Sequence, residues 1–172
     1  MKGRAPPDVE RPARPRYAPP MSEAAVREAL ALLEERAAAA SFEGAKTPWL
    51  VDDAEVVLGF RVPPSYREFL VHLGCGRLGD QDFYGVVDDD FADPGPLEVV
   101  GVIQRARRDQ GLPWEYLPVA PSGDGYLVLD LSRVDGEGEA PVLRWAPGAT
   151  DLERVVVAAS YGAWFLARVR AA

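Results

Sequence analysis

The chain has 172 residues, of which 48% are hydrophobic and 27% charged, and its formal net charge is −8. These are the values of one ordinary globular domain; no apolar run approaches the roughly 20 residues that cross a bilayer, and the negative charge argues against binding phosphate backbones. Because Cys75 is the only cysteine and His72 the only histidine, neither an intrachain disulfide nor a Cys/His zinc site can form, and we expect a cytoplasmic protein without metal or cofactor.

Residues 1–20 differ in composition from the rest of the chain. They contain six prolines, and five basic against two acidic residues give them a net charge of +3, which leaves −11 on residues 21–172. Few of these side chains can bury apolar surface. We therefore predict a disordered Pro/Arg-rich tail over residues 1–20, followed by a single domain over residues 21–172.

Two helices are predicted at the start of this domain. Ser22 can cap a helix that ends before Ser41, in which the residues at helical spacing are Val26, Leu30, Leu33 and Ala37. Asp52 and Glu55 form a possible capping box for a short helix over about residues 53–58, and Gly59 would end that helix in the left-handed conformation.

A proline-led helix and a less regular region follow. Pro64 suits the first helical position, Gly74 ends the helix, and the apolar face consists of Tyr66, Phe69, Leu70 and Leu73. Residues 83–87 are β-prone, residues 88–96 are typical of a loop, and residues 97–100 favour a strand that continues into a helix ending at Gly111.

The second half of the chain is rich in predicted strands. Short apolar or alternating runs at residues 116–119, 126–131 and 142–145 are separated by turn residues, which favours an antiparallel sheet. Ser160 can cap a terminal helix, with apolar residues Trp164, Phe165, Ala167 and Val169. The order of helices, strands and a final helix predicts an α+β fold.

The order and spacing of several motifs resemble the SMI1/KNR4, or SUKH, superfamily. The clearest motif is residues 58–74, LGFRVPPSYREFLVHLG. Later motifs in the expected order are Phe83-Tyr84-Gly85-Val86, the turn Gly123-Asp124-Gly125 before Tyr126, Pro141-Val142, and residues 160–166. The resemblance covers about Asp52 to Val169. The chain departs from the family in Cys75, where a second glycine is expected, and in its proline-rich leader.

The resemblance implies a mostly antiparallel sheet packed with N-terminal helices and a C-terminal helix. It also implies no enzymatic activity. Bacterial members are mostly immunity proteins that bind and neutralise a cognate polymorphic or contact-dependent toxin, often a nuclease, and fungal relatives are interaction modules in cell-wall signalling. We therefore expect a toxin-binding immunity protein, with a regulatory protein-interaction module as the alternative and an enzyme as a distant third.

Several motifs that suggest other chemistry have simpler interpretations. Residues 74–79 fit G-x-G-x-x-G but follow a predicted helix rather than a strand, so they favour a helix-ending loop over a nucleotide site. Cys75 near His72 has no visible orienting group for nucleophilic catalysis. Ser122 lies in a turn and not in a nucleophile elbow, and Asp124 and Asp130 could share a cation only if the strand bent back.

The stretch from Leu78 to Gln104 has seven acidic residues and no arginine or lysine. It does not match an EF-hand, because Ala92 and Asp93 occupy ligand and glycine positions of that loop. One interpretation is a solvated loop, and the other is a negative surface for a basic protein partner, such as a nuclease toxin. Under the second interpretation the partner-binding residues are Asp80, Asp82, Phe83, Tyr84, Asp88, Asp89, Asp90, Phe91, Asp93, Trp114 and Asp124, although Phe83 and Tyr84 equally suit the core.

Overall fold

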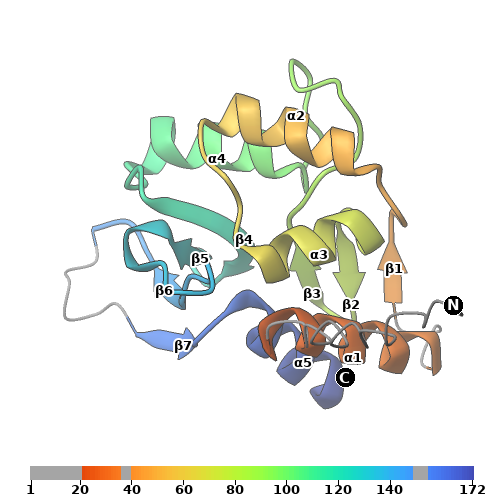
Figure 1. Ribbon diagram of the computed structural model, residues 1–172. Helices are drawn as coiled ribbons and strands as arrows, with labels where there is room; N and C mark the ends of the chain where they lie inside the picture. Colours follow the sequence, from red (N-terminus) through yellow and green to blue (C-terminus); the bar gives the residue numbers. More distant parts are fainter. Residues whose placement is uncertain (1–20, 36–39, 149–154) are drawn as a thin grey trace, which may run out of the picture.

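The structure of the protein is a computed structural model, which describes residues 21–35, 40–148 and 155–172 (Figure 1). Its helices are α1 (Met21–Glu35), α2 (Pro48–Leu58), α3 (Pro64–Leu73), α4 (Val99–Gln110) and α5 (Tyr161–Ala171), with a 3₁₀ turn at Leu131–Arg133. Its strands are β1 (Ala40–Phe42), β2 (Gly76–Leu78), β3 (Gln81–Phe83), β4 (Tyr116–Ser122), β5 (Gly125–Asp130), β6 (Val142–Trp145) and β7 (Val156–Ala158). The predicted tail, residues 1–20, and Ala37 lie outside the described residues.

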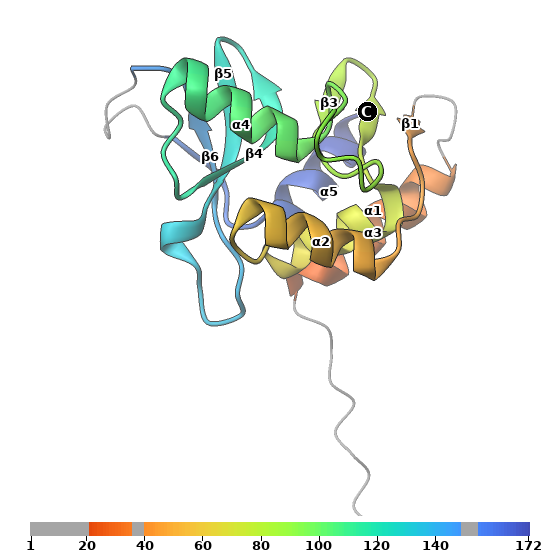
Figure 2. The same cartoon turned by 90° about the horizontal axis from the view of Figure 1, so that it is seen from above.

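The strands form two antiparallel sheets, which confirms the α+β class. One sheet has the order β1-β2-β3 and the other β4-β5-β6-β7. The two sheets meet where the backbone N–H of Tyr84 donates to the carbonyl oxygen of Val119 (2.9 Å). Helices α1 and α5 run side by side, α3 lies next to them, and α2 lies on the other side of α3 (Figures 1 and 2).

The close packing of α1 on α5 depends on Gly162, the second residue of α5. A Cβ at this position would overlap the carbonyl oxygen of Ser22, so only glycine lets the two backbones approach. Ser160 caps α5 as predicted, because its Oγ accepts a hydrogen bond from the backbone N–H of Ala163 (3.2 Å). The start of the terminal helix is therefore confirmed.

The predicted starts of the first two helices were wrong. Helix α1 begins at Met21, so Ser22 lies inside it. Helix α2 begins at Pro48, five residues before the predicted start, because Thr47 is the N-cap and its Oγ1 accepts from the N–H of Leu50 (3.3 Å). Asp52 instead pairs with Arg67 of α3 (2.6 Å). The predicted end of α2 at Gly59, which has φ +82°, is confirmed.

The centre of the chain also differs from the prediction. Residues 83–87 were expected to be β-prone, but strand β3 ends at Phe83. In the rest of that segment, Gly85 forms an isolated β-bridge with Glu98. A Cβ at Gly85 would overlap the carbonyl oxygen of Gly74, so this segment packs against the end of α3 rather than extending the sheet. Residues 97–100 were predicted to form a strand, but α4 begins at Val99. Its end at Gly111 is confirmed.

Candidate functional site

The acidic stretch includes an exposed loop between β3 and α4. Its stem is closed by hydrogen bonds from Gly85 N–H to Leu97 O (3.0 Å) and from Val99 N–H to Gly85 O (2.7 Å). At its tip a carboxylate oxygen of Asp88 accepts from the N–H of Asp90 (2.9 Å), which forms a local turn. The loop therefore carries four exposed carboxylates on a closed base: Asp88, Asp89, Asp90 and Asp93.

A buried carboxyl group holds the base of this loop. Glu98 is 2% exposed, and its Oε2 accepts a hydrogen bond from the N–H of Val87 (2.8 Å). Its Oε1 is buried without a hydrogen-bond partner among the described residues. Burial raises the pKa of Glu98 to about 7, although the hydrogen bond from Val87 opposes the shift.

Replacing Glu98 by glutamine should remove a pH dependence of stability. Because the folded pKa of about 7 exceeds the ordinary value of 4.5, the folded protein binds this proton more tightly, and its free energy of unfolding falls as pH rises between these values. Ionised Glu98 then costs up to about 3 kcal/mol above pH 7. Glutamine keeps an acceptor for Val87 but carries no charge. We expect Glu98→Gln to be the more stable protein at pH 8 and to approach wild type at pH 4 in thermal unfolding; parallel stability curves would contradict this.

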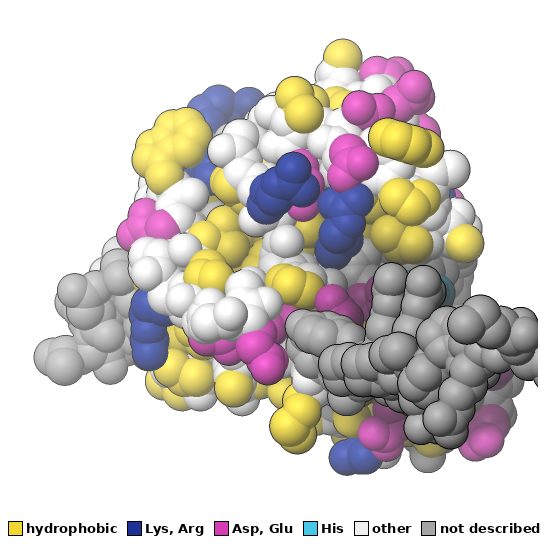
Figure 3. Space-filling view, in the orientation of Figure 1, with side chains coloured by type: hydrophobic (Ala, Val, Ile, Leu, Met, Phe, Trp, Pro, Cys, Tyr) yellow, Lys and Arg dark blue, Asp and Glu magenta, His cyan; other side chains and the backbone are white. Residues whose placement is uncertain are grey.

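An exposed tryptophan lies beside the acidic loop. The side chain of Trp49, near the start of α2, is 76% exposed. It borders a surface hollow of about 410 Å³ between α2 and the loop, whose lining is Ala45, Lys46, Thr47, Trp49, Leu50, Asp53, Val87, Asp88 and Asp89. In Figure 3, acidic and hydrophobic side chains gather at the top of the molecule, where Figure 1 shows α2 and this loop.

Sequence reasoning did not find Trp49. The predicted helix began after it, so the tryptophan had no assigned face. Counted from the true start of α2, the buried positions are Val51, Ala54, Glu55 and Leu58. Trp49 and Asp53 lie one turn apart on the opposite, exposed side of the helix. The Thr47-Pro48 pair, a cap followed by proline at the first helical position, is the signal that could have identified this arrangement.

Trp114 occupies a different surface. It is 77% exposed and follows α4, whereas the acidic loop precedes α4, a helix of 12 residues that rises about 18 Å. The guanidinium carbon of Arg107 lies 4.1 Å from the centre of the Trp114 ring, and an Arg107 N–H donates to the Trp114 carbonyl oxygen (2.9 Å). This tryptophan is therefore already stacked on a cation of its own chain.

The other aromatic candidates are partly or wholly in the core. Phe83 is fully buried, and Tyr84 is 8% exposed, with its carbonyl oxygen accepting from the hydroxyl of Tyr66 (2.8 Å). Phe91 is half-buried and packs against the core. For Phe83 and Tyr84 the structure thus shows the core alternative that the sequence left open, and neither ring is available to a partner.

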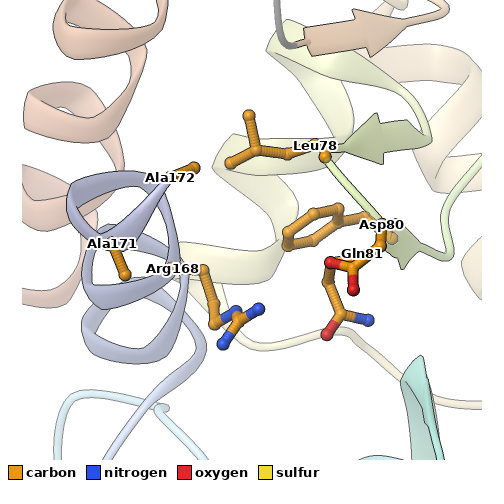
Figure 4. A pocket seen from close by; sticks show the side chains of 8 residues that line it. Leu78, Asp80, Gln81, Arg168, Ala171 and Ala172 are labelled. Atoms are coloured by element: carbon orange, nitrogen blue, oxygen red, sulfur yellow. The ribbon is translucent and has the colours of Figure 1, made fainter.

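The remaining acidic candidates are separated from the loop. Asp80 lines a hollow of about 260 Å³ between the β2–β3 turn and the end of α5, where Arg168 extends toward it (Figure 4). Asp82 pairs with Arg77 (2.6 Å). Asp124 lies in the turn between β4 and β5. None of the three is among the residues that line the hollow beside Trp49.

Cys75 and His72, the two groups considered for nucleophilic catalysis, have different surroundings. The Cys75 side chain is buried, and burial raises the pKa of its thiol to about 12, so the thiol is protonated at neutral pH. His72 is exposed, with Nδ1 2.9 Å from the carbonyl oxygen of Glu68 one helical turn earlier. Among the described residues, no group of three or more His, Cys, Asp or Glu side chains could hold a metal ion. Nor does any described helix combine the length and hydrophobicity needed to cross a membrane.

Comparison with protein-family models identifies a family that covers most of the chain. The SUKH family model described as SMI1-KNR4 cell-wall matches residues 26–166, from α1 into α5. Curated proteins include no match to the chain. The family match covers the helices, both sheets and the acidic loop.

Proposed function

The chain belongs to the SMI1/KNR4 family, and from this premise we propose that it is a non-enzymatic bacterial immunity protein that binds and neutralises a cognate toxin. Domains of this family are protein-interaction modules and generally lack enzymatic activity. The acidic surface, which we define as Trp49, Asp53, Asp88, Asp89, Asp90 and Asp93, is the proposed binding site.

The observation that supports this site is the combination of an exposed tryptophan with carboxylates on two neighbouring elements. Asp53 comes from α2, and Asp88 and Asp89 come from the loop, yet all three border one hollow with Trp49. A nuclease toxin needs a positive groove to hold nucleic acid, and a negative surface can occupy that groove and speed its association. Trp49 supplies the kind of large aromatic side chain that anchors protein interfaces.

Co-expression tests the function itself. The product of the gene immediately upstream is expressed in a bacterial host with and without this protein, and we expect toxicity that this protein relieves. A harmless neighbour, or toxicity without rescue, would contradict the immunity function. A pulldown that recovers several cellular partners instead of one tight partner would favour a regulatory interaction module.

Replacing Asp88, Asp89 and Asp90 together by serine tests the binding surface. Folding should survive, because the three side chains are exposed and a serine hydroxyl in place of the Asp88 carboxylate can keep the local turn. We expect slower association with the toxin and a shallower dependence of binding on salt, since long-range attraction acts mainly on the association rate. Stopped-flow or surface-plasmon measurements at two ionic strengths provide both quantities.

A matched control removes the same charge elsewhere. Glu28, Glu34 and Glu35 are exposed acidic residues of α1, and their replacement by serine should leave the association rate nearly unchanged. Equal rates and salt slopes for wild type and the loop variant would instead move the interface to Trp114, the Gly123–Gly125 turn or the loop of residues 135–139.

A further inference from the structure

Trp49 has the surroundings of a proline-binding side chain. Its ring is exposed, and no ring contact among the described residues involves it. The hollow is lined by three acidic residues, Asp53, Asp88 and Asp89, and by one basic residue, Lys46. Folded domains bind proline-rich segments through exposed aromatic rings, and carboxylates beside such a ring can pair with arginines of the bound segment. The hollow therefore fits a segment that carries both proline and arginine.

The chain contains such a segment, to which the proposed function gives no role. Residues 11–16 read Arg-Pro-Ala-Arg-Pro-Arg. Polyproline II has three residues per turn, so in that conformation Pro12 and Pro15 share one face, and Arg11 and Arg14 share another. The segment has three positive charges and no negative one, which complements the carboxylates around Trp49.

The segment can reach the hollow from the first described residue. Nine residue steps from Pro12 to Met21 span up to about 30 Å. Ser22 and Ser65, the latter at the start of α3, both lie against Gly162. Two residues after Ser65, Arg67 donates to the carbonyl oxygen of Pro48 (3.3 Å), next to Trp49. These contacts across α3 connect the start of α1 with the start of α2, which lie on opposite sides of α3 (Figure 1).

We propose that residues 11–16 dock on the acidic surface of the same chain, with Pro12 and Pro15 against Trp49 and the arginines paired with Asp53, Asp88 and Asp89. The docked segment occupies carboxylates that a basic partner would use, so it competes with that partner. The competition rests on the proposed function, whereas the docking does not.

A spin label tests the docking in the full chain. Ala13→Cys places the label within the segment, and Cys75 stays unreactive because it is buried and its thiol pKa is about 12. At low salt we expect the label to broaden the indole N–H resonance of Trp49 in NMR spectra. Trp114, which is as exposed as Trp49, is the matched control and should broaden much less.

Two further experiments test the docking: removal of the charges around Trp49, and a mixture of spin-labelled and isotope-labelled chains. Replacing Asp53, Asp88 and Asp89 by asparagine, or adding salt, should abolish the broadening of Trp49. No broadening, or equal broadening of Trp49 and Trp114, would overturn the proposal. Broadening of the same size between a spin-labelled chain and a separate isotope-labelled chain would assign the docking to a second copy and would also overturn it.

The competition is measured separately with the toxin. Replacing Arg11, Arg14 and Arg16 by serine should raise the association rate about two- to tenfold, the factor expected if one half to nine tenths of the molecules hold the docked segment. Broadening of Trp49 combined with an unchanged association rate would support the docking and count against the acidic surface as the toxin site.

Discussion

Replacing Phe69 by alanine should lower the free energy of unfolding by about 3–5 kcal/mol, the cost of a large cavity in an aromatic core. Phe69 on α3 is fully buried, and its ring centre lies 5.2 Å from those of both Tyr161 and Phe165 on α5. The rings of Phe42 and Phe83, from β1 and β3, lie 6.1 Å from it. The cavity would therefore open where α3, α5 and the three-stranded sheet meet.

Urea unfolding of the purified proteins measures this cost. Phe60, which is half-buried just after α2, provides the control, and Phe60→Ala should cost much less. If Phe69→Ala is insoluble, Phe69→Leu retains much of the side-chain volume and should lose stability to a smaller extent. A cost for Phe69→Ala no larger than that for Phe60→Ala would show that Phe69 is not at the centre of the core.

Replacing Glu139 by alanine should cost about 2–5 kcal/mol, because it leaves two buried donors without an acceptor. Glu139 is 1% exposed; its Oε1 accepts from the N–H of Ser65 (2.8 Å), and its Oε2 accepts from the Ser65 hydroxyl (2.7 Å). The same Ser65 Oγ accepts from the N–H of Gly162 (3.1 Å). One carboxylate thus ties the loop before β6 to the starts of α3 and α5.

Two further substitutions test whether the loss of stability comes from the hydrogen bonds between Glu139 and Ser65 or from any change in this loop. Glu139→Gln keeps an oxygen for the N–H of Ser65, so it should lose less stability than Glu139→Ala. Glu137→Ala changes an exposed residue of the same loop and should be nearly neutral. Chemical unfolding that ranks Glu137→Ala level with Glu139→Ala would contradict the assigned role. Burial raises the pKa of Glu139, against the two hydrogen bonds from Ser65, so the comparison belongs at one fixed pH.

Residues close together in sequence were sufficient to predict most elements. Pro64 and Gly74 bound α3, Gly59 and Gly111 end α2 and α4, and Ser160 caps α5, because these residues act through their own backbone conformation or through hydrogen bonds within one turn. The family resemblance was carried by the same packing and turn residues, and the match over residues 26–166 confirms it.

The candidate site could be predicted only in part. The exposure of Asp88, Asp89 and Asp90 follows from a run of charge between breakers, which cannot be buried unpaired. The acidic residues between Leu78 and Gln104 do not form one surface, because Asp80 lines a hollow at the end of α5, whereas Asp88 and Asp89 border the hollow beside Trp49. The acidic loop lies beside Trp49 because α2, which comes well before this loop in the chain, packs next to the loop.

By itself the sequence determined where most helices begin or end, that the second half is antiparallel, and that Asp88, Asp89 and Asp90 reach solvent, since all of these depend on neighbouring residues. Only the tertiary structure decided that Phe83 and Tyr84 are buried, that Glu139 bonds Ser65 at a separation of 74 residues, and that Trp49 borders the acidic loop. Such contacts join segments whose separation along the chain carries no periodic signal, and a carboxylate in a glycine-rich loop has the same local pattern whether it is solvated or buried.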